Sequence, residues 1–236
     1  NKKNKTMKNL KALFLLLIGA IAMSLTSCNT DDGYSAYTPE QQKQIQSQMY
    51  GTYTGKLKIQ KPSADGRKWE SMYNNITSWD CKAGDPYRGE DSLIVVRNFP
   101  INMLDSAIYI SSKDESDQAK TLRALRTAIS KLPAEDIKCK YFVPSTDPQF
   151  TLTNGYKFIL NPYIISKKLE YNGESHTVYF VFQMNYYVGV YTQSGSRNMK
   201  LNMLFASISV DKEPVDYYPS FPINYFRPLI VTCGYE

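Results

Sequence analysis

Few residues in this chain have the type and spacing that catalysis needs. The sequence contains one histidine, His176, so a Ser/His/Asp or Cys/His site would depend on that residue alone. No Cys-x-x-Cys, His-x-x-x-His, glycine-rich phosphate loop or nucleophile elbow occurs. The sequence therefore predicts no metal site and no cofactor.

Paired carboxylates are the remaining route to catalysis, since glycoside hydrolysis uses two carboxyl groups across a cleft. Sequence spacing does not show whether two carboxylates face each other. The adjacent acidic pairs all lie in expected turns or helix starts: Asp31-Asp32, Glu90-Asp91, Asp114-Glu115 and Glu135-Asp136. His176 lies beside a predicted Asn172-Gly173 turn, where a solvated side chain is the simpler interpretation. We therefore predict a protein that is not an enzyme, with a carboxylate-based hydrolase as the alternative.

The net charge of +6 belongs mostly to the N-terminal segment. Residues 1–27 contain five lysines and no acidic residue, which leaves 23 basic and 22 acidic residues, or about +1, on the rest of the chain. A basic surface for nucleic acid is therefore not expected, and we predict no nucleic-acid partner. A chain of 236 residues is long enough for one domain with a substantial core.

The N-terminal segment has the layout of a secretory signal. Lys8 and Lys11 precede an apolar run at residues 12–23, which is too short to span a bilayer stably. Ala20-Ile21-Ala22 offers a small-x-small cleavage site that would release a soluble protein. Cleavage there would leave an unpaired cysteine, Cys28, near the start of the mature chain.

A competing cleavage site is Leu25-Thr26-Ser27-Cys28, which resembles the lipobox of bacterial lipoproteins, where the cysteine is acylated and cleavage occurs just before it. This site is favoured because it accounts for Cys28. The resemblance implies lipid attachment at Cys28 and a membrane partner, since several acyl chains on one residue give lasting attachment. It divides the chain into a signal peptide at residues 1–27, a lipidated tether at residues 28–37 and one domain at residues 38–236.

The segment after the lipobox bears on the location of the protein. Asn29-Thr30-Asp31-Asp32 is acidic, and acidic residues at this place resemble the surface-export signal of Bacteroidetes lipoproteins. The alternative is a solvated linker on a periplasm-facing protein. We expect an outer-membrane lipoprotein, with the surface-facing orientation slightly favoured over the periplasm-facing one.

The cysteines do not indicate a disulfide framework. If Cys28 carries lipid, Cys81, Cys139 and Cys233 remain, so at most one disulfide can form. Cys139 alternates with apolar neighbours, and we interpret it as a small core residue. A Cys81–Cys233 bridge stays open as an alternative.

The second half of the chain has the pattern of antiparallel strands. Residues 164–171 are expected to pair with residues 177–191 through Asn172-Gly173, a strong hairpin signal. Residues 178–182 are apolar on both faces, so one face must meet a core and the other a helix, a second sheet or a ligand cavity. Further strands are expected at residues 50–59, 93–96, 137–143, 199–210 and 229–233.

Two helices are expected among these strands. Thr38, Pro39 and Gln41 predict the start of a short polar helix, because they suit the N-cap, the first turn and a capping box. An amphipathic helix is predicted at residues 113–132, with Ser112 and Glu115 as its capping box. Its apolar stripe consists of Leu122, Leu125, Ile129 and Leu132. We interpret the basic residues beside this stripe as a solvated face.

A short segment recurs in the chain. Phe-Pro-Ile-Asn occurs at residues 99–102 and again at residues 221–224. We expect the first copy to interrupt a strand that resumes at residues 107–110. Two similar strand-edge bulges, or coincidence, explain the recurrence better than a duplicated half-domain.

The first predicted strand carries Gly51-x-Tyr53-x-Gly55 directly after the short helix. This arrangement resembles the calycin-like barrels of Bacteroidetes lipoproteins, and lipocalins have Gly-x-Trp at the equivalent place. The resemblance implies that an arginine late in the chain packs on Tyr53, for which Arg227 is the candidate. We predict a mainly β fold, a single antiparallel curled sheet or calycin-like barrel, with a β-sandwich as the alternative.

The aromatic residues bear on function. The chain has 19 tyrosines and two tryptophans. Trp69, Trp79, Tyr217 and Tyr218 lie in segments that read as irregular, where a ring could stack on sugar, so we take them as candidate ligand-binding residues. The leading hypothesis is non-catalytic binding of a glycan or small hydrophobic molecule, and the alternative is a structural or protein-interaction subunit of an envelope assembly. A cavity inside the barrel would favour the first, and a packed interior with an exposed aromatic patch would favour the second.

Overall fold

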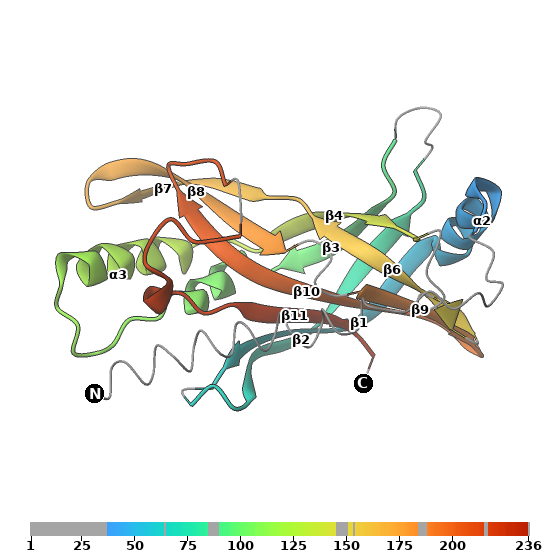
Figure 1. The fold of residues 1–236 in the computed structure, drawn as a ribbon, viewed down its shortest axis with the longest axis horizontal. Coiled ribbons are helices and arrows are strands. Elements are labelled where there is room, and N and C mark those ends of the chain that lie inside the picture. The colour runs from blue at the N-terminus through green and yellow to red at the C-terminus, as the bar shows by residue number, and fades with distance from the viewer. Residues whose placement is uncertain are drawn as a thin grey trace, which may run out of the picture.

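Eight antiparallel strands close into a barrel in the computed structural model, which describes residues 37–63, 65–84, 90–144, 151–152, 154–183, 188–214 and 217–235 (Figure 1). The barrel strands are β1 (Gly51–Pro62), β2 (Trp69–Lys82), β3 (Leu93–Phe99), β4 (Glu135–Phe142), β6 (Gly155–Pro162), β9 (Val188–Ser194), β10 (Ser196–Val210) and β11 (Leu229–Gly234). Neighbours follow the order β11-β1-β2-β3-β4-β6-β9-β10, and β10 pairs with β11 to complete the ring. The predicted antiparallel barrel is confirmed, and the β-sandwich alternative is wrong.

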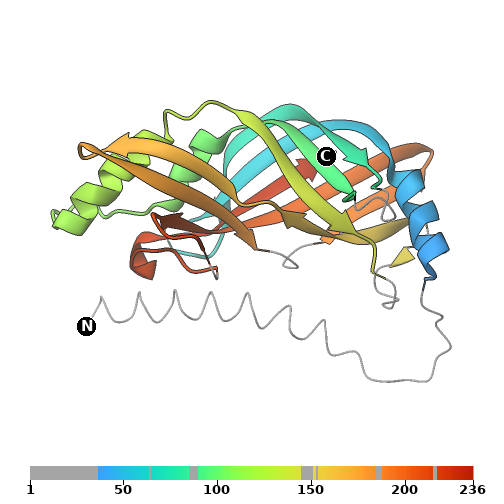
Figure 2. The same ribbon diagram turned by 90° about the horizontal axis from the view of Figure 1, so that it is seen from above.

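The long strand β10 carries a sheet extension beyond the barrel. On one edge, residues 201–205 pair with β11. On the other edge, residues 196–200 pair with β9 and residues 204–210 pair with β8 (Glu174–Gln183). β7 (Ile165–Tyr171) pairs with the far edge of β8. β7, β8 and the end of β10 therefore form an extension at one end of the molecule, seen from above in Figure 2.

Side chains fill the interior of the barrel. Leu57, Trp79, Phe158 and Phe205 have no accessible surface, and Tyr141 has 1%. A side chain without accessible surface has no water-sized void beside it. The described part of the interior is therefore packed by side chains, as in other small barrels.

The Gly-x-Tyr-x-Gly motif on β1 allows a close approach of three elements. A Cβ added at Gly55 would lie 2.6 Å from the carbonyl oxygen of Gly234 and 2.9 Å from the ring of Trp79. The rings of Tyr53 and Trp79 stack, with centroids 6.3 Å apart and an interplanar angle of 13°. The Tyr53 hydroxyl donates to the carbonyl of Met49 at 2.7 Å, which ties the barrel to the helix before β1.

The arginine that packs on Tyr53 is Arg197 of β10. Its guanidinium carbon lies 5.8 Å from the Tyr53 ring centroid, and its Nη2 donates to the carbonyl of Gln48 at 2.6 Å. Arg227 instead lies over the ring of Tyr109, at 3.6 Å from the centroid. The prediction of Arg227 is therefore wrong, because the start of β10, rather than the segment before β11, lies beside the end of the first helix.

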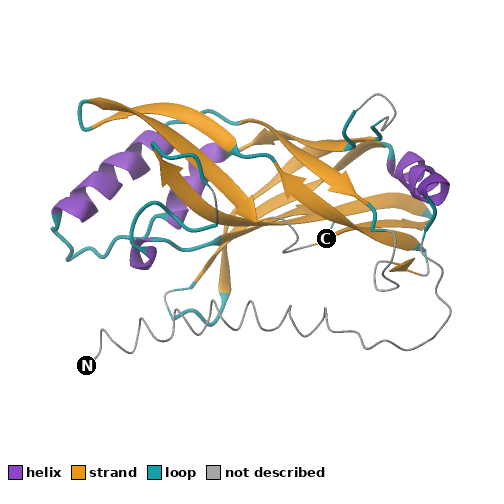
Figure 3. Ribbon diagram, turned by 45° about the horizontal axis from the view of Figure 1, so that its top comes forward, coloured by secondary structure: helices purple, strands orange, loops and turns teal. Residues whose placement is uncertain are grey.

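Helices cover the two ends of the barrel (Figure 3). α2 (Pro39–Met49) has the predicted capping box between Thr38 and Gln41, and it buries Ile45 and Met49. α3 (Asp117–Ile129) starts later than predicted, because Ser116 accepts a hydrogen bond from the Ala119 N–H and is the true N-cap. Leu122, Leu125 and Ile129 of the predicted stripe are buried, but α3 ends at Ile129, so Leu132 lies beyond the helix and is half-buried. Within the part of the chain that the structure describes, none of the helices has the length and apolar character to cross a membrane.

The predicted β7–β8 hairpin is confirmed. Asn172 and Gly173 have φ of 54° and 82°, and they join β7 to β8. Gly195, with φ of 75°, joins β9 to β10. β5 (Thr151–Leu152) pairs with the start of β6. The strand predicted at residues 177–191 is divided into β8 and β9, and residues 184–187 between them lie outside the described residues.

The two Phe-Pro-Ile-Asn segments have the same local structure. Each proline precedes a 3-10 helix, η2 (Ile101–Ala107) after the first copy and η4 (Ile223–Tyr225) after the second. The residues that follow meet in an antiparallel bridge between Ile108 and Phe226. The strand predicted at residues 107–110 is wrong, since only this single bridge forms there.

The three described cysteines are free thiols. Cys81, Cys139 and Cys233 are each at most 1% exposed, and no disulfide joins Cys81 to Cys233. Cys139 is a core residue, as predicted. Burial raises the pKa of the Cys81 and Cys139 thiols to about 12 and also raises that of Cys233, because a buried thiolate loses its hydration.

These thiols are expected to be unreactive in the folded protein. Because burial excludes reagents and keeps the sulfurs protonated, a thiol-specific reagent should label none of the three at mildly alkaline pH. All three should react at once in concentrated guanidinium, as measured by absorbance or mass spectrometry. A native protein that labels readily at any of them, or a denatured protein that shows only one thiol, would contradict this packing.

Candidate functional site

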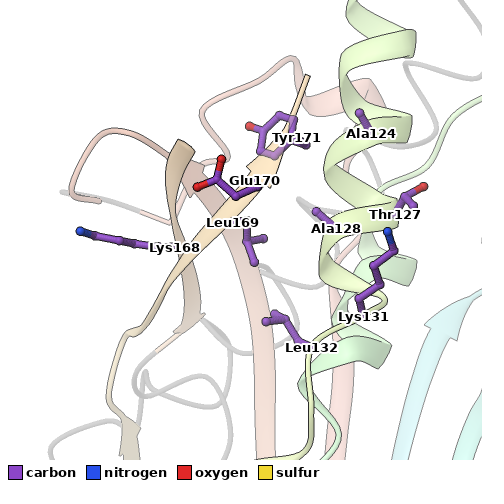
Figure 4. Close-up of a pocket in the computed structure, with 9 residues that line it drawn as sticks. All are labelled: Ala124, Thr127, Ala128, Lys131, Leu132, Lys168, Leu169, Glu170 and Tyr171. Atoms are coloured by element: carbon purple, nitrogen blue, oxygen red, sulfur yellow. The ribbon is translucent and has the colours of Figure 1, made fainter. Parts of the chain in front are cut away.

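An open groove runs between α3 and the edge strand β7 (Figure 4). Its volume is about 480 Å³. The Asn172-Gly173 turn and the pairing with β8 set the position of β7, and the buried stripe of α3 sets that of the helix. The groove is lined by Ala124, Thr127, Ala128, Lys131, Leu132, Lys168, Leu169, Glu170 and Tyr171.

The floor of the groove is apolar. Leu169 points from β7 toward Leu132 on the helix side, whereas Lys168 points away from α3 (Figure 4). Burial raises the pKa of Tyr171 to about 12, so its hydroxyl stays neutral and able to form a hydrogen bond. The groove therefore combines small apolar side chains with one phenol.

The rim of the groove carries unpaired charges. Lys131, Lys168 and Glu170 are exposed. Among the described residues, no ion pair or side-chain hydrogen bond occupies any of the three, whereas the neighbouring Lys167 is paired with Glu135. The rim charges are therefore available to a partner in the groove.

The outer edge of β7 has unpaired backbone groups. The N–H of Thr177 donates to the Asp211 carboxylate at 2.8 Å, and its carbonyl accepts from the Asp211 N–H at 2.8 Å. The backbone of Thr177 thus faces away from β7, so Lys168 opposite it forms no ladder bonds with β8. The N–H and C=O groups of Lys168, and by alternation those of Ser166 and Glu170, point outward. Within the described chain no strand pairs with this edge.

His176 has a structural role at the base of the hairpin. Its Nδ1 lies 2.6 Å from the Asp211 carboxylate, and its ring stacks on Tyr171 with centroids 4.2 Å apart. The hydrogen bond to His176 lowers the pKa of Asp211. This pair joins β8 to the end of β10, and it holds the groove side of β7 in place.

The acidic residues form local contacts. Asp91 pairs with Lys140 at 2.6 Å, and Asp114 accepts a hydrogen bond from the Ser116 hydroxyl at 2.7 Å. The hydrogen bond from Ser116 is the main cause that lowers the pKa of Asp114 to about 2. Asp31-Asp32 lies outside the described residues. The described residues contain no group of three or more His, Cys, Asp and Glu side chains placed to hold a metal ion.

The four aromatic residues predicted to bind ligand lie in different structural environments. Trp69 and Trp79 lie on β2 rather than in an irregular segment, so that part of the prediction is wrong. Trp79 is fully buried in the barrel, and Trp69 is half-buried ten residues away along the strand. Tyr217 and Tyr218 lie in an irregular segment, as predicted, and are 39% and 65% exposed. Cys28 lies outside the described residues.

Comparison with known families places the groove in a defined domain. The family model described as Domain of unknown function (DUF4840) matches residues 48–210. The chain belongs to this family. The DUF4840 region runs from the end of α2 to the end of β10, so it contains α3, β7 and the groove, while β11 lies beyond it. No significant match was found among curated proteins or among solved structures.

The groove was not predicted from the sequence. The α3 stripe and the β7–β8 hairpin were both predicted, but their meeting depends on the ring order of the barrel. One signal was present in the sequence: Lys168 and Glu170 alternate with Leu169 and Tyr171, which is the pattern of a strand with one apolar and one charged face.

Proposed function

We propose that this DUF4840 protein is a non-catalytic interaction subunit of the bacterial envelope, anchored to the outer membrane by lipid on Cys28. It binds an extended polypeptide, which adds to β7 as a further strand. The observation that carries this proposal is the unpaired outer edge of β7 beside an apolar groove. Strand addition to an open sheet edge is a recurrent mode of peptide recognition.

The packed barrel favours this role over a ligand held inside the barrel. The side chains of Leu57, Trp79 and Phe158, which face the interior, have no accessible surface. A calycin-like barrel that carries a small molecule would need room between these side chains. The groove outside the barrel is therefore the better candidate for binding.

The chemistry of the groove suits an added strand. The outward N–H and C=O groups of Ser166, Lys168 and Glu170 would pair with its backbone. Every second side chain of that strand would face Ala128 and Leu132, where small apolar groups fit. The remaining side chains would lie beside Lys168 and Glu170 and would take the opposite charges.

The location is supported by sequence alone. Leu25-Thr26-Ser27-Cys28 supports acylation at Cys28, and Asp31-Asp32 supports a surface-facing orientation in a Bacteroidetes-type envelope. A lipid anchor confines the domain to a plane, which raises the local concentration of any partner in the same membrane. Weak contacts at one sheet edge are then sufficient for binding.

Hydrogen–deuterium exchange tests strand addition directly. The β7 segment of the full-length protein should exchange more slowly in the envelope than in dilute purified protein, while β3 should exchange equally in both. Lys168→Pro should abolish the difference, because proline removes the outward N–H and leaves the pairing with β8 intact. Lys168→Ala is the matched control and should retain it. Equal exchange of wild-type β7 in both settings would refute the proposal.

A small molecule or glycan is the second candidate occupant. The groove volume of about 480 Å³ lies within the range of small-molecule sites. Such a ligand has no strand backbone to pair with Ser166, Lys168 and Glu170. It would slow exchange equally in Lys168→Pro and wild-type protein, and this outcome would identify it.

A further inference from the structure

We infer that the strand added to β7 is β7 of a second copy of the same chain. This inference rests on the proposed function, because it names the partner of the same edge. The two β7 strands run antiparallel, with Leu169 of each copy facing Leu169 of the other. The resulting dimer is isologous, since both copies contribute the same residues.

Charge complementarity selects this register. With Leu169 opposite Leu169, Lys168 of each copy lies directly opposite Glu170 of the other. A shift of one copy by two residues places Lys168 opposite Lys168, and a shift the other way places Glu170 opposite Glu170. Like charges directly opposite one another destabilise a strand pair, whereas opposite charges stabilise it. The Lys168-x-Glu170 spacing thus makes the edge complementary to itself.

The hydrogen-bond pattern of the edge is compatible with this register. Lys168 and Glu170 are residues whose N–H and C=O groups point outward, as the bonds between Thr177 and Asp211 establish. Antiparallel strands bond where two outward-facing residues lie opposite each other. The two Lys168–Glu170 pairs meet this condition and supply about four backbone hydrogen bonds. The backbone pattern thus allows only registers that differ by an even number of residues, and charge selects this register among them.

The available charges and space are consistent with a second copy. Lys168 and Glu170 are exposed, and no ion pair among the described residues competes for them. The groove offers about 480 Å³ on the α3 side, where Leu169 of the second copy would lie. Lysine at a sheet edge commonly prevents pairing. Here Lys168 lies opposite Glu170 of the other copy in one register only, and in that register the lysine does not prevent pairing.

Reversal of the charges at Lys168 and Glu170 in two co-expressed copies tests this register. Two differently tagged copies of the full chain are co-expressed, one tag is used for purification, and the recovered amount of the other copy is measured. The wild-type copies should co-purify. Lys168→Glu alone, or Glu170→Lys alone, should lower recovery roughly ten-fold or more, because each places like charges opposite each other twice. Co-expression of Lys168→Glu with Glu170→Lys should restore recovery, since every charge then meets its opposite.

The other outcomes of this experiment either support the dimer or overturn it. The double variant Lys168→Glu/Glu170→Lys should also self-associate, and circular dichroism should show that all variants fold. The inference is overturned if wild-type copies do not co-purify, if either single exchange leaves recovery unchanged, or if the mixed pair fails to recover. In those cases, slow exchange of β7 in the envelope would still support strand addition by another polypeptide. Failure of both experiments would remove the proposed function as well.

Discussion

Replacement of Trp79 by alanine is expected to lower the free energy of unfolding by about 3–5 kcal/mol, which is the range for truncation of a buried tryptophan. Trp79 has no accessible surface, stacks on Tyr53 and lies against Gly55. Within the described residues its Nε1 has no hydrogen-bond partner, so packing accounts for its contribution. Because small domains are stable by about 5–15 kcal/mol, this loss is large, and urea denaturation followed by circular dichroism would measure it.

Trp69 supplies a matched control on the same strand. It is half-buried at the start of β2, so Trp69→Ala should cost about 1 kcal/mol or less. A larger loss from Trp69→Ala than from Trp79→Ala would contradict the packing of the barrel. Any effect of Trp69→Ala on sugar binding would have to appear without a change in stability, which separates the ligand-binding prediction from the structural one.

Replacement of Cys28 by serine is expected to move nearly all of the protein from the membrane fraction to the soluble fraction. In the proposed anchor the Cys28 thiol carries the lipid and a serine hydroxyl cannot replace it, and the rest of the chain has a net charge of only about +1, too little to hold it on an anionic surface. Fractionation of cells followed by immunoblotting measures the distribution. A wash in high salt removes material that is bound only by charge.

Ser27→Ala is the control for this experiment. It keeps a small residue directly before Cys28, so cleavage and membrane attachment should be unchanged. If the Cys28→Ser protein sediments with membranes after the salt wash, the lipid anchor is not what attaches the protein. Mass spectrometry of the wild-type N-terminus would then identify the true cleavage site.

Local patterns in the sequence were sufficient to predict most elements. Asn172-Gly173 predicted the β7–β8 hairpin because only a tight turn with positive φ suits that pair. The stripe on α3 predicted the buried face of the helix correctly. Its start was misplaced because Ser112 and Ser116 both precede acidic residues, and it is the Ser116 hydroxyl that accepts the hydrogen bond from the Ala119 N–H.

Contacts between distant segments could not be predicted. The segment that contains Trp79 was predicted to be irregular because most of β2 has both faces partly exposed. This exposure removes the alternation of apolar and polar residues that marks a strand. Arg197 packs on Tyr53 only because β10 returns past the end of α2. The candidate groove depends in the same way on where β10 places β8 and β7 against α3.

The pairing of β11 with β1 has a consequence for the order of folding. This seam joins residues 56–60 to residues 230–234, so the ring cannot close before the far end of the chain is available. During synthesis from the N-terminus, β1 can pair with β2 early, but its other edge must wait for β11. Contacts between residues so far apart in the sequence slow folding, because the chain loses the entropy of a long loop before the two strands can form hydrogen bonds. The barrel therefore acquires its cooperative stability only once β11 has formed, and its open β1 edge needs protection from aggregation until then.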